Sequence, residues 1–252
     1  MSELLIECRD VSCGYDDTPV LEHVDLQVAR GEILAILGPS GCGKSTLLRM
    51  LIGLLPPLAG DVQLFDRPLY AIDADERREL LHRAGVAFQQ DALFESITLE
   101  DNVALPLREL ARLREPVVRE MVRMRLGLVG LAGLQQRLPN ELSGGQRKRA
   151  ALARASIMDP ELIACDEPTA GLDPVVAAGI DELLLRFRDL LGMTLVVVSH
   201  ELTSIRAIAT RALMLANGGV HAAGTVDELA ASRDPTVYEF FHARPAREAR
   251  SA

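Results

Sequence analysis

A glycine-rich loop after an apolar stretch constrains this chain more than any other feature. Residues 31–37 read GEILAIL, which after Glu32 is apolar throughout and typical of a strand buried on both faces. GPSGCGKS follows at 38–45 and fits the pattern G-x-x-x-x-G-K-[ST], and from Lys44 onward leucines recur with helical spacing. The alternative is an ordinary glycine-rich turn, but the flanking strand and helix favour a phosphate-binding loop.

Such a loop binds phosphate because glycines let backbone N–H groups approach phosphate oxygens, and because the helix N-terminus attracts negative charge. Lys44 would reach the β- and γ-phosphate oxygens, and Ser45 would be a ligand for Mg²⁺. The sequence therefore predicts binding of a nucleoside triphosphate with Mg²⁺. The residues expected to contact it here are Gly38, Pro39, Ser40, Gly41, Cys42, Gly43, Lys44, Ser45 and Thr46.

Two acidic residues follow another apolar strand. LIACDE at 162–167 ends in Asp166 and Glu167, so two carboxylates lie where the strand leaves its sheet. Asp166 can hold Mg²⁺ through water, and Glu167 can polarise an attacking water molecule. An acidic pair of this kind is by itself usually a solvated strand end. Together with the phosphate-binding loop, it indicates hydrolysis.

LSGGQ at 142–146 precedes an alanine-rich helix. Ser143, Gly144 and Gly145 stand where that helix begins, so they can offer a hydroxyl and free backbone donors to a phosphate. Taken alone, the segment is a serine-capped helix. The first loop, however, already encloses the phosphates of one nucleotide. A second phosphate-binding helix start predicts a two-chain arrangement, in which each nucleotide lies between the Lys44 loop of one chain and the Ser143 loop of a second copy.

Composition excludes several other classes of function. The net charge is −9, whereas a nucleic-acid-binding protein presents a basic face, so we expect no nucleic-acid partner. No stretch has the length and apolarity of a membrane span, and the opening MSELLIECRD lacks the features of a signal peptide, so we expect a soluble chain. The cysteines at 8, 13, 42 and 165 include no C-x-x-C pair, which favours reduced thiols over a disulfide or a zinc site.

The order of strands and helices predicts a doubly wound α/β core with a helical insertion. Val24, Leu26 and Val28 alternate with polar residues, as in a half-buried strand. Residues 60–69 resemble one further strand, and GMTLVVVSH at 192–200 has the apolar run of another. The chain turns helical and arginine-rich from about 99 to 160. We expect a stripe within this part to pack in the core, formed by Val117, Met121, Met124 and Leu128.

These motifs resemble the nucleotide-binding subunit of ABC transporters, over nearly the whole chain. GPSGCGKST is similar to the Walker A of that family, LIACDE to its Walker B, and LSGGQ matches its signature letter for letter. The resemblance implies an α/β fold with a P-loop (RecA-like) parallel core sheet, an N-terminal antiparallel β subdomain and an inserted α-helical subdomain at about 90–158. It implies an ATPase domain at 1–230 and a C-terminal extension at 231–252.

Smaller motifs match the same family by order and spacing. Tyr15 stands at the adenine-stacking position, Asp173 ends the D-loop AGLD, and His200 is the switch histidine. FQQ leaves two glutamines as candidates for the Q-loop, and we take Gln89 over Gln90 because the family's glutamine directly follows the strand. The resemblance implies catalytic roles for Lys44, Gln89, Glu167 and His200, Mg²⁺ ligands in Ser45, Gln89 and Asp166, and further ATP contacts from Tyr15, Gln89, Ser143, Gly144, Gly145, Gln146, Asp166 and Asp173.

The resemblance also implies a function, namely ATP hydrolysis that drives a membrane permease. The insertion begins with QQDALFESITLEDNVALPL, where the family docks a cytoplasmic helix of the permease. ALFESITLEDNVALPLRE and DPTVYEFFHARP look most like the Mla-type, MCE-associated ATPases, which move phospholipids between bacterial membranes. That likeness implies an MlaE-like permease, an MCE-domain lipid-binding protein and a candidate STAS-domain subunit as partners. It also implies a peripheral location on the cytoplasmic face of the inner membrane.

Four alternatives differ in class: an importer for another small solute, a soluble ABC ATPase without a transport role, a P-loop kinase, and a non-hydrolysing binding module. A kinase has no use for LSGGQ, and a binding module would be expected to lack Glu167 or His200. Soluble ABC proteins usually have long coiled coils or duplicated domains, which this sequence lacks. The transported substrate and the direction of transport stay open.

The end of the chain predicts one more helix, with Asp234 as its cap and Pro235 as its first residue. Val237, Phe240 and Phe241 would share one face of it. This apolar face either docks on the dimer partner or another subunit, or covers the core of its own chain.

Overall fold

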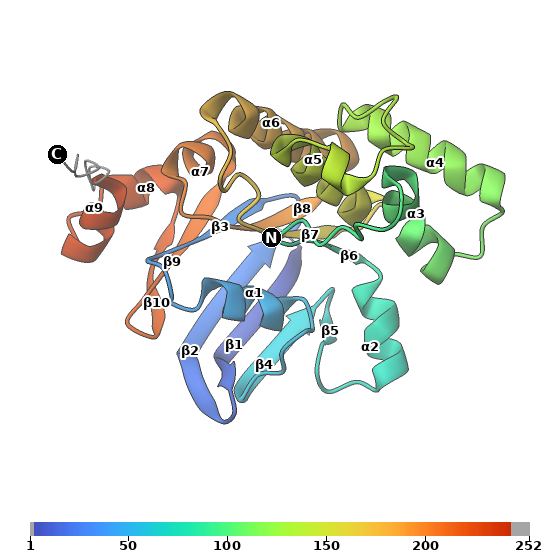
Figure 1. The fold of residues 1–252 in the computed structure, drawn as a ribbon. Coiled ribbons are helices and arrows are strands. Elements are labelled where there is room, and N and C mark those ends of the chain that lie inside the picture. The colour runs from blue at the N-terminus through green and yellow to red at the C-terminus, as the bar shows by residue number, and fades with distance from the viewer. Residues whose placement is uncertain (1–2, 243–252) are drawn as a thin grey trace.

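The computed structural model of the chain describes residues 3–242, which form two sheets surrounded by helices (Figure 1). A four-stranded antiparallel sheet has the order β2-β1-β4-β5, and a six-stranded sheet has the order β10-β9-β3-β8-β7-β6. The strands are β1 (Leu4–Tyr15), β2 (Thr18–Ala29), β3 (Ile33–Leu37), β4 (Ala59–Leu64), β5 (Arg67–Pro68), β6 (Ala84–Ala87), β7 (Leu162–Asp166), β8 (Thr194–Val198), β9 (Arg211–Ala216) and β10 (Gly219–Gly224).

Helices follow most strands of the second sheet and cover both of its faces (Figure 1). They are α1 (Lys44–Leu51), α2 (Ala74–Leu81), α3 (Leu99–Leu110), α4 (Glu115–Leu128), the short 3₁₀ helix η1 (Pro139–Glu141), α5 (Gly144–Ser156), α6 (Pro174–Leu191), α7 (Leu202–Ile208), α8 (Val226–Ala230) and α9 (Pro235–His242). None of the helices described between residues 3 and 242 is both long and apolar enough to cross a bilayer.

Strand β3 is the centre of the second sheet. It pairs in parallel with β8 on one side and with β9 on the other, and all five of its residues are buried. Strands β7 and β6 continue the parallel pairing beyond β8, while β10 pairs antiparallel with β9 at the edge. Because neighbouring parallel strands end at the same edge of a sheet, the segments that follow β3, β7 and β8 meet there.

The two faces of this sheet pack against different helices. Leu34 and Ile36 of β3 share a buried cluster with Leu47 of α1 and with residues of the antiparallel sheet. Cys165 of β7 and other residues pointing to the opposite face join a second cluster with the buried sides of α5 and α6, including Leu152. Helices α1 and α5 therefore lie on opposite faces of one sheet.

Two sequence-based expectations about strands have different outcomes. Val24, Leu26 and Val28 are buried and their neighbours on β2 are exposed, which confirms the half-buried strand. Residues 60–69, by contrast, do not form one strand. Strands β4 and β5 pair as a hairpin that turns at Phe65 and Asp66, whose φ angles are 52° and 59°. Two successive left-handed residues are typical of the tight turns that join antiparallel strands.

The expectation for α4 is correct for two of its four residues. Met121 and Leu128 are partly buried and pack against the second cluster, whereas Met124 is 60% exposed and Val117 is 39% exposed. The fully buried apolar row is Val118, Val122 and Leu126. The sequence has two adjacent apolar rows, and periodicity alone does not say which of them faces the protein. The buried row is harder to recognise because it includes Arg125, which pairs with Asp159 at 2.5 Å.

Helix α9 covers the core of its own chain. The Asp234 carboxylate accepts hydrogen bonds from the backbone N–H groups of Thr236 and Val237, as expected of a cap. Val237 is fully buried and Phe241 is 5% exposed, and both belong to a cluster with residues of α7, α8 and β9. Of the two alternatives for the apolar face, the described part of the tail adopts the intramolecular one. The rest of the predicted extension, 243–252, lies outside the described residues.

The orientation of α4 can be tested with two truncations on one helix. Val122→Ala should lower the free energy of unfolding by about 2 kcal/mol, because it removes buried methyl groups and leaves a cavity. Met124→Ala should change it by less than about 0.5 kcal/mol, because that side chain is mostly in water. Urea denaturation of both variants measures the difference, and equal losses would contradict the assigned orientation.

Candidate functional site

The loop between β3 and α1 needs glycine at several positions. Gly38, Gly41 and Gly43 have φ angles of 142°, 80° and 101°. A Cβ atom at Gly38 would lie 2.3 Å from the carbonyl oxygen of Leu215, so no other residue fits there without a backbone shift. The loop joins β3 directly to the start of α1, so the strand, glycine loop and helix follow one another in the predicted order.

The start of α1 has free backbone donors. Gly43 is the N-cap residue that precedes the helix, and no side chain accepts a hydrogen bond from the first turn. The first helical hydrogen bond runs from Leu47 N to Gly43 O at 2.9 Å. The preceding N–H groups are therefore available to an anion. The Lys44 side chain is buried and its Nζ donates to the carbonyls of Gly38 and Pro39 at 2.8 and 2.9 Å. An ammonium group has three donors, so one remains for a phosphate oxygen.

Ser45 lies next to the first of the two predicted carboxylates. Its hydroxyl donates to Asp166 Oδ1 over 3.3 Å. Burial raises the pKa of Asp166 above its ordinary value, the hydrogen bond from Ser45 opposes this, and the charge of Glu167 adds to it. A cation beside the carboxylate would offset the cost of its charge. A hydroxyl and a carboxylate oxygen suit Mg²⁺, which takes its remaining ligands from phosphate and water.

No cluster of three metal-binding side chains occurs among residues 3–242. A site held by protein groups alone, such as a zinc centre, is therefore not found in that part of the chain. Ser45 and Asp166 fit Mg²⁺ that is held jointly with a nucleotide. The four cysteines, all of them within the described part of the chain, form no disulfide there.

Glu167 and His200 form a contact at the ends of β7 and β8. His200 Nδ1 lies 2.7 Å from Glu167 Oε1, and the backbone N–H of Glu167 donates to the carbonyl of Val198 at 2.8 Å. The Glu167 side chain is only 10% exposed. Its second oxygen, Oε2, is buried and accepts no hydrogen bond from the described residues. One oxygen of Glu167 thus contacts the histidine, and the other has no hydrogen-bond partner among the described residues.

Tyr15 ends β1, and its ring is partly exposed beside α1. Its hydroxyl accepts a hydrogen bond from Arg49 Nη1 at 2.9 Å, which fixes the ring relative to the helix that follows the loop. Gln89 lies two residues beyond the end of β6, with Phe88 in between, and is exposed. No hydrogen bond joins its side chain to Asp166 among the described contacts.

The LSGGQ segment begins α5 as predicted, but its residues also have structural tasks. Ser143 Oγ accepts from Gln146 N at 3.3 Å while Gln146 Oε1 accepts from Ser143 N at 2.9 Å, so the two residues form a capping box. A Cβ atom on Gly145 would lie 2.4 Å from Cγ1 of Val176, so packing against α6 requires this glycine. Asp173 caps α6 by accepting from Val175 N and from the next N–H, each at 3.1 Å.

The structure brings some of these residues together and keeps others apart. Residues 38–46, Asp166, Glu167 and His200 lie at one edge of the parallel sheet. Ser143 starts a helix on the face of that sheet opposite to α1, and it is exposed. Within one chain, the helices that follow the Lys44 loop and the Ser143 loop therefore lie on different faces of the sheet.

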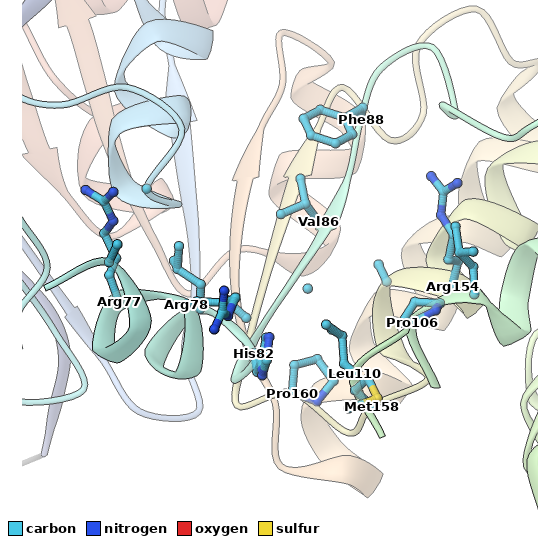
Figure 2. A pocket seen from close by; sticks show the side chains of 17 residues that line it. Arg77, Arg78, His82, Val86, Phe88, Pro106, Leu110, Arg154, Met158 and Pro160 are labelled. Atoms are coloured by element: carbon cyan, nitrogen blue, oxygen red, sulfur yellow. The ribbon is translucent and has the colours of Figure 1, made fainter. Parts of the chain in front are cut away.

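A groove that the sequence did not predict in detail lies between α2, β6, α3 and α5 (Figure 2). Its volume is about 600 Å³. Figure 2 shows Arg77 and Arg78 on one side, Val86 of β6 with Phe88 just beyond that strand in the middle, and Pro106 with Arg154 on the other side. None of the described residues that line it is acidic, and none belongs to the 38–46 loop. Only the start of the insertion at QQDALFESITLEDNVALPL signalled this region in advance.

Comparison with known proteins gives consistent relatives. A model of the ABC transporter family matches residues 21–170. The chain is 40% identical over 240 residues to the intermembrane phospholipid transport system ATP-binding protein MlaF of Haemophilus influenzae, covering 95% of this chain and 91% of that protein. It is 38% identical over 239 residues to the probable ribonucleotide transport ATP-binding protein mkl of Mycobacterium leprae, covering 95% of this chain and 69% of that protein.

Solved structures give the same answer for the fold. A dimeric post-hydrolysis state of the ATP-binding cassette MJ0796 with ADP and Pi has a TM-score of 0.80 and 31% sequence identity, covering 88% of this chain and 98% of that one. The cassette cbiO1 from Clostridium perfringens, part of a transporter complex, has a TM-score of 0.84 and 29% identity, covering 91% and 92%. These likenesses confirm the predicted fold class. The chain belongs to the ABC transporter family, as one of its ATP-hydrolysing cassettes.

Proposed function

We propose that this cassette drives a permease that moves phospholipid between bacterial membranes, and that two copies of it close around ATP. The observation that supports hydrolysis most directly is the buried Glu167, with one oxygen on His200 and the other free, at the sheet edge that also holds the phosphate-binding loop. A base that is fixed in this way and kept from bulk water is suited to orient a nucleophilic water molecule.

Each residue of the site has a separate task in this proposal. Lys44 and the N-terminus of α1 bind the phosphates, and Tyr15 stacks on the adenine ring. Ser45, Gln89 and Asp166 hold Mg²⁺, which when bound neutralises charge on the β- and γ-phosphate oxygens. Glu167 polarises the water, and His200 fixes Glu167 and faces the γ-phosphate. Such chemistry depends on positioning and charge stabilisation more than on covalent steps.

Two copies are needed because the second half of the site is on another surface. Ser143 is exposed and lies across the sheet from the Lys44 loop. Val175, two residues after the D-loop residue Asp173, is 82% exposed although it is apolar, which suits a surface that a second copy covers. The structurally similar cassette MJ0796 has been solved as a dimer. We propose that this chain also pairs with a second copy, head-to-tail, with ATP between each Lys44 loop and the Ser143 loop of the other copy.

The groove of about 600 Å³ suits the cytoplasmic helix of a permease. Its apolar floor and its rim of Arg77, Arg78 and Arg154 would accept an amphipathic helix with an acidic group. We propose an MlaE-like permease as this partner, with an MCE-domain protein and a STAS-domain subunit as further members of the complex. The chain would then lie on the cytoplasmic face of the inner membrane.

Phospholipid is the substrate that the relatives favour. The chain covers 91% of MlaF from H. influenzae at 40% identity, but only 69% of mkl, whose printed function is ribonucleotide transport. Co-purification of the chain with its permease from detergent-solubilised membranes, followed by mass spectrometry of bound small molecules, decides between them. Stoichiometric phospholipid supports the proposal. A bound ribonucleotide other than ATP or ADP would support the second candidate.

Replacements of Lys44 and of Glu167 should affect ATP binding and turnover differently. Lys44 contacts phosphate in the ground state and the transition state, so Lys44→Ala should weaken ATP binding as well as turnover. Glu167→Gln should leave Mg-ATP bound while turnover falls by about 10²–10⁴-fold, the usual contribution of a positioned base. Equilibrium binding of labelled ATP and release of phosphate separate the two effects. Wild-type turnover in Glu167→Gln would refute the assigned base.

The shared site predicts that replacing Ser143 by a bulky residue blocks closure of the dimer. Glu167→Gln with Mg-ATP should accumulate a closed dimer, and adding Ser143→Arg should prevent it, because the bulky side chain would fill the space next to the phosphates of the other copy. Light scattering of the purified chain and of the reconstituted complex gives the dimer fraction. The shared-site arrangement is wrong if the double variant closes as readily as Glu167→Gln alone.

Without Mg²⁺, the ionised carboxylate of Asp166 should lower the free energy of unfolding of the chain. A carboxyl group whose pKa is higher in the folded chain binds more protons there, so the free energy of unfolding falls as pH rises above the ordinary value of 3.8. In EDTA and without nucleotide, Asp166→Asn should therefore unfold at a higher temperature than wild type at about pH 7, and the gain should vanish towards about pH 4. Calorimetry across this pH range measures it. A variant that is less stable than wild type at neutral pH would contradict the account.

A further inference from the structure

Three cationic side chains of α5 hold the loop that contains Gln89. We define the Gln89 loop as residues 89–92. Lys148 Nζ donates to the backbone carbonyl of Gln89 and lies 3.3 Å from Asp91 Oδ1. Arg147 Nε lies 3.5 Å from Asp91 Oδ2. Arg154 donates to the carbonyls of Asp91 and Ala92, at 3.0 and 2.7 Å. A single helix thus contacts three of the four residues of this loop.

The contact with Lys148 is buried, which distinguishes it from a surface ion pair. Lys148 is 8% exposed and the Asp91 side chain is 14% exposed. A lysine is seldom buried unless its ammonium group is paired, because removing that charge from water is costly. The carbonyl of Gln89 and the carboxylate of Asp91 together provide that pairing. Replacement of Lys148 by an apolar residue would leave the Gln89 carbonyl without its donor and the Asp91 carboxylate without its buried cation.

The conformation of the loop also depends on these contacts. Asp91 and Ala92 both have left-handed backbone angles, with φ of 58° and 50°. An alanine rarely adopts this conformation, and such strain persists only where the surroundings hold it. Here the carbonyl oxygens of both strained residues accept hydrogen bonds from Arg154. The donors from α5 therefore fix the direction in which the loop leaves β6.

Helix α5 connects three functional regions in this way. It starts at the Ser143 loop, holds the Gln89 loop through Lys148 five residues later, and reaches the groove through Arg154, which lines it next to Pro106 (Figure 2). If a partner bound in the groove moved α5, then Gln89 and Ser143 would therefore be displaced together.

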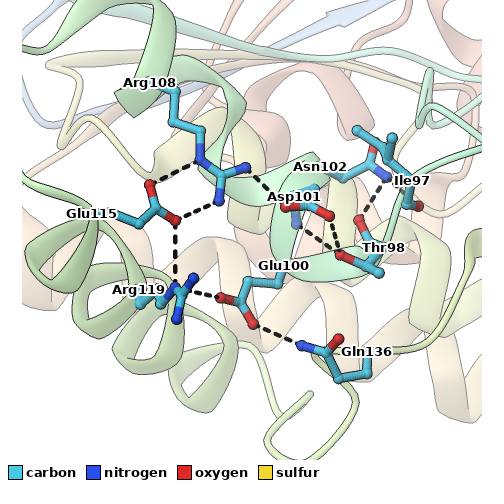
Figure 3. A network of polar contacts seen from close by, with 9 residues as sticks. All are labelled: Ile97, Thr98, Glu100, Asp101, Asn102, Arg108, Glu115, Arg119 and Gln136. Carbon is cyan, nitrogen blue, oxygen red and sulfur yellow. Dashed lines mark hydrogen bonds and ion pairs between the residues drawn. The ribbon is translucent and has the colours of Figure 1, made fainter.

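A second attachment fixes the segment that precedes Ser143. The backbone N–H groups of Leu99 and Glu100 donate to the carbonyls of Arg137 and Gln135, at 2.8 and 2.9 Å. Gln136 Nε2 donates to Glu100 Oε2 at 3.0 Å, within a network of ion pairs that joins α3 to α4 (Figure 3). The segment that leads to Ser143 is therefore attached to the start of α3.

We propose that Lys148 is a positioning residue that locks the Gln89 loop to α5, so that Gln89 and Ser143 move as one unit during the ATP cycle. The proposal rests on the function proposed above, in which Gln89 serves the nucleotide of its own chain and Ser143 serves that of the second copy. Lys148 itself touches neither nucleotide. It acts through the carbonyl of Gln89, with Arg154 as its support at the other end of the loop.

Hydrogen exchange of the purified full-length chain tests the lock without any ATPase assay. Lys148→Met should make the backbone amides of residues 89–92 exchange about tenfold faster, as expected for the loss of one hydrogen bond. Arg149→Met is the matched control, because its guanidinium lies on the same helix but donates to Val129 O at 3.1 Å. It should leave the exchange of 89–92 unchanged. Unchanged exchange in Lys148→Met would overturn the proposal.

Steady-state kinetics tests the positioning role. In Lys148→Met we expect kcat to fall by about 10- to 100-fold, the usual cost of a small misplacement of a reacting group. The KM for ATP should change less than about threefold, because Lys44 and Tyr15 are untouched. Lys148→Arg should restore most of kcat, because a guanidinium can donate to the same carbonyl and carboxylate. If Lys148 only stabilised the fold, kcat per folded molecule would not change, and that result would overturn the proposal.

Glu167→Gln in the same assay separates this inference from the function on which it rests. If Glu167→Gln is inactive and Lys148→Met retains the kcat of wild type, the lock is refuted and the proposed function stands. If Glu167→Gln hydrolyses ATP like wild type, the proposed function fails. Hydrogen exchange then still decides whether Lys148 holds the Gln89 loop, with unchanged exchange as the refuting result.

Discussion

The backbone of the phosphate-binding loop, residues 38–45, packs closely against Leu215 and Leu21, and the rest of the structure depends on this constraint. Gly38 lies against the carbonyl of Leu215, and Gly43 lies against the side chain of Leu21, so a Cβ atom at either position would clash. This contact is possible because β3 is fully buried between β8 and β9 and ends directly before the loop. The sheet thereby sets the position of Lys44, and parallel pairing brings Asp166, Glu167 and His200 to the same edge.

In the proposed function, one chain holds only half of each nucleotide site. The central sheet separates α1 from α5, and the two helices bury their apolar sides in different clusters. Such an arrangement couples ATP hydrolysis to movement of the two copies, because hydrolysis requires them to come together and product release lets them separate. Helix α5 is well placed to coordinate the two halves, since it begins at Ser143 and contacts the Gln89 loop and the groove.

The motifs of the site could be predicted from the sequence because each depends on local geometry. The loop at 38–45, the strand end at Asp166 and the helix start at Ser143 combine a residue type with a neighbouring element, and both are visible within about ten residues. The buried face of α4 was predicted only in part, because two adjacent apolar rows of this helix differ only in what lies across from them. The contact of Lys148 with Gln89 spans 59 positions, and no local pattern indicates it. Likewise, the need for Gly145 comes from Val176 on another helix.

A cross-link between the two halves of the site tests the shared arrangement most directly. Cys42 is native to the phosphate-binding loop, and Cys8, Cys13 and Cys165 are buried, so Ser143→Cys adds one accessible partner. A flexible bifunctional maleimide, which can reach across the space that ATP would occupy, should give a covalent dimer of this variant on a denaturing gel when nucleotide is left out, because Cys42 of one copy would face residue 143 of the other. Cys42→Ala should abolish the dimer. A cross-link that forms only within a single chain, or a covalent dimer that persists without Cys42, would contradict the account.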